Sequence, residues 1–341
     1  SMFARISGPS AWKHSTRLLM LPIVVANSFS TFAVTDRYAN AVVGALVADA
    51  ASMGLHWIYD TDKVKSLVEE SKNKDPAFFE PPSCPFYQYK SGRQSPYGAE
   101  ALGMLRLLSS KQPRTLDQLS RDFASSFDSY DGYINKATKL LVQNLAEGKS
   151  YPNCGAVDSQ ANGMVKVPIL VARYGGSPDF LTRVGEVVLV HQNHEVPVRI
   201  AKAAASILHR IATGHAIPDA LAWAEQPGSP LDEQTRGEMA AAAASMAGCD
   251  TPPSWTAKLG PSCMLPSAFL VSLHILRVAG SYQEAVRLNL LAGGDQCSRS
   301  SFIGACFAAQ DPDAVPPEWL AKVDAIGEIK SLVADLRAAA A

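Results

Sequence analysis

The chain of 341 residues lacks a charge imbalance, because 31 Lys and Arg residues stand against 32 Asp and Glu residues and leave a formal net charge of −1. Without a sequence-wide basic field, nucleic acid and anionic membrane surfaces are not expected as partners. The six cysteines form no C-x-x-C pair and are too sparse for a disulfide scaffold. This use of cysteine favours a reduced, intracellular protein without structural zinc.

The first 35 residues lack acidic side chains, and the first acid of the chain is Asp36. They contain Arg5, Lys13, Arg17, several serines and the apolar run LLMLPIVVA, a composition typical of a targeting segment. That run is too short to span a bilayer as a helix, so no membrane span is expected from it. Residues 1–35 are therefore expected to be an N-terminal extension, either an address for an organelle (mitochondrion or plastid) or an arm packed on a cytoplasmic domain.

Strand-like alternation is scarce from residue 36 onward. YANAVVGALVADAASMGLHWI, VPVRIAKAAASILHRIATG and SRSSFIGACFAAQ have the apolar content and spacing of packed helices. The nearest approach to a strand, FLTRVGEVVLV, suits a helix about as well. We therefore predict an all-α fold with a single large domain over residues 36–341.

Asp49 lies among small and apolar neighbours in GALVADAASMG. An ionised carboxylate in such a helix requires a cation, a set of hydrogen-bond donors or a raised pKa. A structural bond to another helix and a role in a functional site would both meet this requirement.

Two further acids stand at predicted helix starts. Glu100 follows SPYG, and Asp295 follows Gly293 and Gly294, which permit a tight approach of the backbone. The helix dipole and free N–H groups explain a carboxylate in a first turn, and Asp295 or Ser298 could cap the helix that runs through SFIGACFAAQ. If folding brings these two acids beside the one in the apolar helix, the three would suit an oxygen-seeking cation such as Mg²⁺.

Two other motifs carry polar groups of use to a ligand. HQNHE places His191 and His194 three residues apart, on one face if the segment is helical. The pair is a weak zinc signal without HExxH or a third ligand, and a hydrogen bond to a ligand or a neighbouring loop is the favoured role. In DSQANGMVKVP, Asn162 and Gly163 could expose backbone donors in a turn or a phosphate cradle.

The order of these motifs resembles that of the ADP-ribosylglycohydrolase family, and within it the branch of the J-type crystallins. The resemblance runs from about residue 41 to residue 309. VGALVADAASMGLHWIYD is similar to the opening helix, CPFYQY and SPYGAEALGML to the second block, YDGYI and ANGMVKVPIL to the middle blocks, HQNHE to the histidine block, and GGDQCSRSSFIGA to the closing block. Each block is loose, but their order and collinearity make the resemblance specific.

This resemblance implies a single large orthogonal helical bundle that holds two Mg²⁺ ions in a cleft. It implies that ADP-ribose, or an ADP-ribosylated substrate, binds beside the ions and that an N- or O-glycosidic bond of the ribose is hydrolysed. Paired cations would orient the ribose hydroxyls and promote water. The metal ligands expected in this chain are Glu100, Asp295 and Ser298. The residues expected to contact substrate are Asn162, Gly163, His194, Gly293 and Gly294.

The chain departs from the family pattern at the acids. Active members carry Thr-Asp-Asp-Thr where this sequence has Gly98–Ala101, and a second closing acid where it has Cys297. A frequent family glutamate is replaced by His56. Two Mg²⁺ ions would bring four positive charges against the two negative charges of Glu100 and Asp295, and a thiol is a poor ligand for Mg²⁺. We therefore expect at most one ion.

Two functions stay open on this basis. The first is a hydrolase in which Asp295 and Glu100 hold one Mg²⁺ while His56 or Asp49 assists proton transfer. The second is a catalytically inactive relative that binds ADP-ribose-like ligands or serves as a crystallin-like structural protein. The sequence indicates no oligomeric state.

Overall fold

The structure is a computed structural model that describes residues 36–340. The expected N-terminal extension, residues 1–35, lies outside the described residues. Within the described range the chain forms sixteen α-helices and two short 3₁₀ helices. This part of the chain contains no β-strand, only the isolated bridges Ala156–Gln192 and Gln160–Met264. The predicted all-α fold is confirmed.

The helices of the first half are α1 (Arg37–Ser52), η1 (Met53–Leu55), α2 (Thr61–Glu70), α3 (Pro96–Ser109), α4 (Leu116–Ser125), α5 (Lys136–Ala146), η2 (Met164–Lys166), α6 (Val167–Tyr174) and α7 (Phe180–His191). The helices of the second half are α8 (Glu195–Ala212), α9 (Ile217–Ala224), α10 (Glu233–Ser245), α11 (Pro252–Leu259), α12 (Ser267–Val278), α13 (Tyr282–Leu291), α14 (Gln296–Gln310), α15 (Pro317–Leu320) and α16 (Ile326–Ala340).

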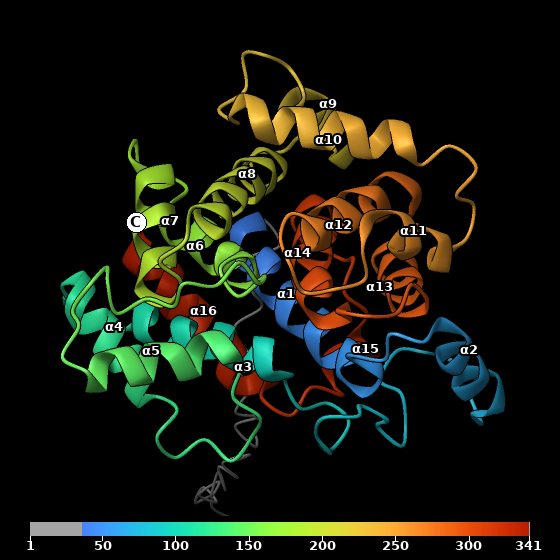
Figure 1. Cartoon of the computed structure of the whole chain (residues 1–341), viewed down its shortest axis with the longest axis horizontal. Helices are drawn as coiled ribbons and strands as arrows, with labels where there is room; N and C mark the ends of the chain where they lie inside the picture. The colour runs from blue at the N-terminus through green and yellow to red at the C-terminus, as the bar shows by residue number, and fades with distance from the viewer. Residues whose placement is uncertain (1–35, 341) are drawn as a thin grey trace, which may run out of the picture. The chain divides into compact units, whose positions relative to one another are not determined.

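Helices α1 and α14 form the centre of the domain, with α6, α8, α12 and α16 packed around them (Figure 1). Gly44 of α1 and Gly304 of α14 allow the two backbones to touch. A Cβ at Gly44 would lie 2.7 Å from the carbonyl oxygen of Gly304, and a Cβ at Gly304 would lie 2.6 Å from that of Gly44. Because α1 carries Asp49 and α14 begins after Asp295, this crossing fixes where the two acids lie.

The stretch Arg37–Leu55 is long and apolar enough to cross a membrane, but 83% of its apolar window is buried inside the domain. The stretch is therefore the core helix of this fold. Its start is set by Asp36, whose side chain accepts hydrogen bonds from the backbone N–H groups of Tyr38 and Ala39. This is the only such helix in the part of the chain that the structure describes.

The HQNHE segment differs from the expectation of a shared helix face. His191 is the last residue of α7, and His194 is the N-cap of α8, where its Nδ1 accepts the Val196 N–H at 3.1 Å. Gln192 is extended and separates the two helices. The segment FLTRVGEVVLV, which suited a strand or a helix, lies within α7.

Candidate active site

Asp49 is the acid buried in α1. Its carboxylate accepts hydrogen bonds from the backbone N–H (2.8 Å) and the hydroxyl (2.6 Å) of Ser95, the N-cap residue of α3. Gly98 packs against the same group, because a Cβ there would lie 2.1 Å from Oδ2. Burial raises the pKa of Asp49 to about 7, opposed by the Ser95 hydrogen bonds. Asp49 thus ties α1 to the start of α3, as expected of a structural bond between helices.

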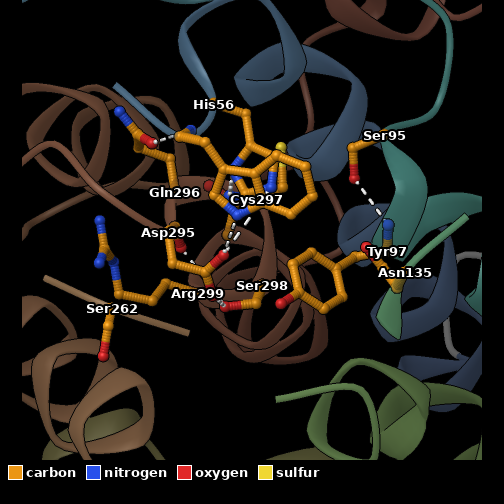
Figure 2. A network of polar contacts seen from close by, with 12 residues as sticks. His56, Ser95, Tyr97, Asn135, Ser262, Asp295, Gln296, Cys297, Ser298 and Arg299 are labelled. Carbon is orange, nitrogen blue, oxygen red and sulfur yellow. Dashed lines mark hydrogen bonds and ion pairs between the residues drawn. The ribbon is translucent and has the colours of Figure 1, made fainter. Parts of the chain in front are cut away.

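Asp295 occupies the N-cap position of α14, but its side chain does not cap the helix. Oδ1 accepts the indole N–H of Trp57 at 2.9 Å, and Oδ2 accepts the hydroxyl of Ser298. Burial raises the pKa of Asp295 to about 6, opposed first by the Ser298 hydrogen bond. Figure 2 shows Asp295 and Ser298 facing each other, with His56 and Tyr97 nearby.

Trp57 reaches Asp295 from an unusual backbone conformation. Its φ of 62° lies in the left-handed region, which is uncommon for a residue other than glycine. The Trp57 N–H donates to the carbonyl oxygen of Gly294 at 2.9 Å and to Oε1 of Gln296 at 3.1 Å. Gly294 itself has a φ of 80°, and a Cβ there would lie 2.1 Å from the carbonyl oxygen of Pro261. The expected tight approach at the glycine pair is confirmed, and it holds the indole against the acid.

His56 and Tyr97 place polar atoms beside Asp295 that lack protein partners. The backbone N–H of Cys297 donates to Nδ1 of His56 at 3.2 Å, so the proton of the neutral ring lies on Nε2. That atom is 3.8 Å from Oδ1 of Asp295. Burial lowers the pKa of His56 well below its usual value, which keeps the ring neutral. Among the described residues neither Nε2 of His56 nor the Tyr97 hydroxyl has a hydrogen-bond partner, so His56 offers Asp295 a donor rather than a base.

Glu100 is buried in α3 and surrounded by donors from α5 and η2. Its Oε1 accepts hydrogen bonds from Asn135 Nδ2 (3.1 Å) and Thr138 Oγ1 (2.7 Å). Its Oε2 accepts one from Asn162 Nδ2 (2.9 Å) and lies 3.6 Å from Nζ of Lys166. Both oxygens of the Glu100 carboxylate therefore accept hydrogen bonds from the protein, and an ammonium lies nearby.

These arrangements do not fit the Mg²⁺ site that the family resemblance implies. Mg²⁺ binds through free carboxylate oxygens, and Glu100 has none to offer. Cys297, in the place of the second closing acid, has its thiol 3.6 Å from the backbone carbonyl oxygen of Asp49, and burial raises its pKa well above the usual value. Over residues 36–340, no group of three or more His, Cys, Asp and Glu side chains is arranged to hold a metal ion. No chemical step is derived through such an ion.

A pocket of about 170 Å³ lies beside residues that hydrogen-bond Asp295 and Glu100. It is lined by Trp57, which bonds Asp295, and by Asn135, which bonds Glu100. The other lining residues are Tyr59, Phe86, Tyr133, Lys136, Gln160 and Cys263. A second pocket, of about 190 Å³, lies against another face of α3 and includes none of the three acids in its lining. The first of these two, called the aromatic pocket below, also contains none of the three acids in its lining, but its Trp57 bonds Asp295 and its Asn135 bonds Glu100.

The local structure corrects the expectation that Glu100 stands in a first helical turn. Helix α3 begins at Pro96 after the Ser95 N-cap, and its first turn contains no acid. Ser followed by Pro is the stronger start signal, because Ser caps free N–H groups and Pro suits the first helical position. Ser298 does not cap α14 either. Its hydroxyl accepts no free backbone N–H and instead donates to Asp295.

The expectation of exposed backbone donors at Asn162 and Gly163 is wrong. Both residues are fully buried, and Gly163 has an ordinary helical φ of −69°. A Cβ on Gly163 would lie 3.0 Å from Cγ1 of Val188, so the glycine serves the packing of α7. Asn162 contributes its side-chain amide to Glu100 instead.

Sequence reasoning missed Ser95, Trp57 and Lys166. Two of them carried a signal: Ser95 precedes a proline as N-caps do, and Lys166 stands inside the apolar run MVKVPILVA, where a charge requires a partner. Trp57 carried none, because its role depends on a backbone conformation that only the folded chain reveals.

Known proteins are similar to this chain in sequence and in fold. The family model described as ADP-ribosylglycohydrolase matches residues 31–341. Crystallin J1A of Tripedalia cystophora is 27% identical over 314 residues, which cover 86% of this chain and 94% of the crystallin. Crystallin J1B of the same animal is 27% identical over 307 residues, covering 85% and 92% respectively.

A solved structure titled "ADP-ribosylglycohydrolase-related protein complex" superposes with a TM-score of 0.69 at 17% identity, covering 90% of this chain and 99% of that one. At this identity the likeness concerns the fold alone, and the fold is the helical bundle that the sequence led us to expect. With a family model spanning nearly the whole described chain and two full-length relatives, the chain belongs to the ADP-ribosylglycohydrolase family.

Proposed function

We infer that this chain binds a ribosyl ligand in the aromatic pocket and does so without a divalent metal ion. The single observation that carries this inference is that Glu100 already accepts three hydrogen bonds and pairs with Lys166, while the Trp57 donor to Asp295 lines the aromatic pocket. Glu100 is hydrogen-bonded by other residues of the protein. Asp295 lies near Nε2 of His56 and the Tyr97 hydroxyl, which have no hydrogen-bond partner among the described residues.

The lining of the aromatic pocket supports a ligand with a flat or hydroxyl-rich face. Trp57 and Tyr133 meet edge to face with ring centroids 5.3 Å apart, and Asn135 and Gln160 add amide groups. The ammonium of Lys136 stands at the rim with its side chain 66% exposed, where it could meet a phosphate. Pockets for drug-sized ligands measure roughly 300–1,000 Å³. A pocket of about 170 Å³ therefore favours the ribose phosphate part of ADP-ribose over the whole molecule.

Calorimetric titration tests this inference. Ribose 5-phosphate and ADP-ribose are titrated separately into the full chain, once with EDTA and once with Mg²⁺. We expect both to bind with the same affinity in the two buffers, and we expect Lys136→Ala to weaken both. Lys149→Ala is the matched control, because Lys149 is an exposed lysine outside the pocket lining. Absence of heat from either ligand, or equal effects of the two lysine changes, would contradict the inference.

A second candidate is hydrolysis of an ADP-ribosyl bond by Asp295. Burial raises the pKa of this carboxyl to about 6, close to neutrality, where a carboxyl group can exchange a proton with substrate or water. Release of ADP-ribose from an ADP-ribosylated protein would be followed by chromatography, with Asp295→Asn as the variant expected to stop it. If neither Mg²⁺ nor EDTA buffer supports release by the unaltered chain, this candidate is withdrawn.

A further inference from the structure

Lys166, at the end of η2, is a fully buried lysine, and its ammonium lies among three acceptors. Nζ donates to the backbone carbonyl oxygen of Asn162 at 2.7 Å and lies 2.9 Å from Nδ1 of His191. The third neighbour is Oε2 of Glu100 at 3.6 Å. Burying an ammonium is costly unless it is paired and hydrogen-bonded, so these three contacts account for a lysine in the core.

The hydrogen bonds around Lys166 have one consistent direction. An ammonium only donates, so Nδ1 of His191 accepts and the proton of the neutral ring lies on Nε2. From there the ring donates to Oγ1 of Thr138 at 2.9 Å, and the Thr138 hydroxyl donates to Oε1 of Glu100 at 2.7 Å. Burial, and then the Lys166 cation, lowers the pKa of His191 well below its usual value, in agreement with a neutral ring.

The atoms that converge on Nζ are of the kinds that bind cations. They are a carboxylate oxygen, an imidazole nitrogen and a backbone carbonyl oxygen, supplied by α3, α7 and the segment before η2. Divalent ions such as Mn²⁺ and Zn²⁺ take this mixture of oxygen and nitrogen ligands. A lysine ammonium is a compact point charge with three donors, and it makes directed contacts to all three atoms.

We propose that Glu100, His191 and the Asn162 carbonyl form a cation site whose cation is the ammonium of Lys166. The positive charge at this site is part of the polypeptide, so the site is complete without any metal ion. A divalent ion could enter only if the ammonium left, because the two would otherwise stand in contact. This proposal concerns the Glu100 side alone and does not depend on which ligand enters the aromatic pocket.

A double-mutant cycle tests the pairing. Lys166→Met and Glu100→Gln each leave one buried charge without its partner, whereas the double variant replaces both charges by neutral groups of similar size. We expect each single variant to unfold at a lower urea concentration than the unaltered chain, and the double variant to unfold at a higher concentration than the Lys166→Met variant. If the effects of the two changes simply add, Lys166 is not the counter-ion of Glu100 and the proposal fails.

Metal binding by a truncated variant tests the nature of the site. Mn²⁺ is added to the Lys166→Ala variant, and the bound ion is counted from the loss of the electron paramagnetic signal of free Mn²⁺. We expect one bound ion per chain and a raised melting temperature, neither of which the unaltered chain should show. The second change His191→Ala should abolish both effects. The matched control is Lys149→Ala, which removes a lysine that is 46% exposed and lies outside both sites.

Three results would overturn the proposal. They are equal Mn²⁺ binding by the unaltered chain and the Lys166→Ala variant, no binding by a folded Lys166→Ala variant, and binding that survives the added His191→Ala change. If the Lys166→Ala variant does not fold, the urea cycle decides, because the double variant carries no unpaired buried charge.

Discussion

Glu100 and Asp295 are both buried carboxylates, and their surroundings differ. Glu100 receives three hydrogen bonds and an ammonium from residues of the protein itself. Asp295 receives two hydrogen bonds, and the nearby Nε2 of His56 and hydroxyl of Tyr97 have no partners within the described chain. The contacts of Glu100 are thus made within the protein, whereas Asp295 lies beside polar atoms that could bind a ligand. Retention of an acid at a motif position therefore does not by itself preserve its availability.

The largest expected effect is on the free energy of unfolding, and it compares the loss of Glu100 with the loss of Asp295. Glu100→Ala removes the carboxylate that pairs with the buried Lys166 ammonium, and breaking a buried pair typically costs about 3–5 kcal/mol. Asp295→Ala should cost less, because its donors Trp57 and Ser298 are neutral and the nearby buried Arg299 is hydrogen-bonded to Asn289 and Gly293. Urea unfolding of both variants measures the difference, and equal losses would remove the contrast.

The next effect is the dependence of stability on pH. Burial raises the folded-state pKa of Asp49 to about 7 from an unfolded value of 3.8. Between these values Asp49 holds more protons in the folded chain than in the unfolded chain, so its contribution to the free energy of unfolding should fall as pH rises, by at most about 1.4 kcal/mol per pH unit. Asp295, with a pKa raised to about 6, adds to the same trend.

Asp49→Asn should flatten this dependence, because the amide does not titrate. Urea unfolding at several pH values between about 4 and 7 measures the slope for both chains. A slope that is the same in the unaltered chain and the Asp49→Asn variant would contradict the expected contribution of Asp49.

A smaller effect comes from matched hydroxyl deletions. Thr138→Val removes the hydroxyl that joins His191 to Glu100, and should cost about 1–3 kcal/mol because buried polar atoms lose their partner. Ser298→Ala removes the hydroxyl on Asp295 and should cost less, because other donors lie nearby. Thermal unfolding compares the two variants, and the reverse order would show that Asp295 is the more tightly held acid.

The smallest expected effect on stability is that of Trp57→Phe. An aromatic ring is kept, but the N–H donor to Asp295 and part of the indole surface are lost; because Trp57 is only partly buried, the cost should be about 0.5–1.5 kcal/mol. Because this change frees a lone pair of Asp295 toward the aromatic pocket, ribose 5-phosphate affinity should change as well. Calorimetry that shows an unchanged affinity would separate Trp57 from the ligand site.

The sequence was sufficient for the fold class and for part of the site. Apolar periodicity predicted helices α1, α8 and α14, and motif order predicted the family. The need of Asp49 for a partner was also visible, because a carboxylate in an apolar helix cannot stand alone. The partner itself, Ser95, lies 46 residues away, and no local pattern identifies it.

The rest of the site depends on contacts between distant segments. Glu100 was expected in a first helical turn, but Ser95 and Pro96 start the helix earlier and place the acid in the core. His191 and His194 were expected on one helix face, but the chain turns between them. The Lys166 contacts join α3, α5, η2 and α7, an assembly that sequence spacing does not encode.

The most direct test of whether this chain binds its ligand without a metal ion is calorimetry. ADP-ribose is titrated into the unaltered chain, once in EDTA and once in Mg²⁺. Because Glu100 is saturated and already paired with Lys166, we predict the same dissociation constant in both buffers. Binding that tightens by about tenfold or more in Mg²⁺, equivalent to about 1.4 kcal/mol, would contradict it.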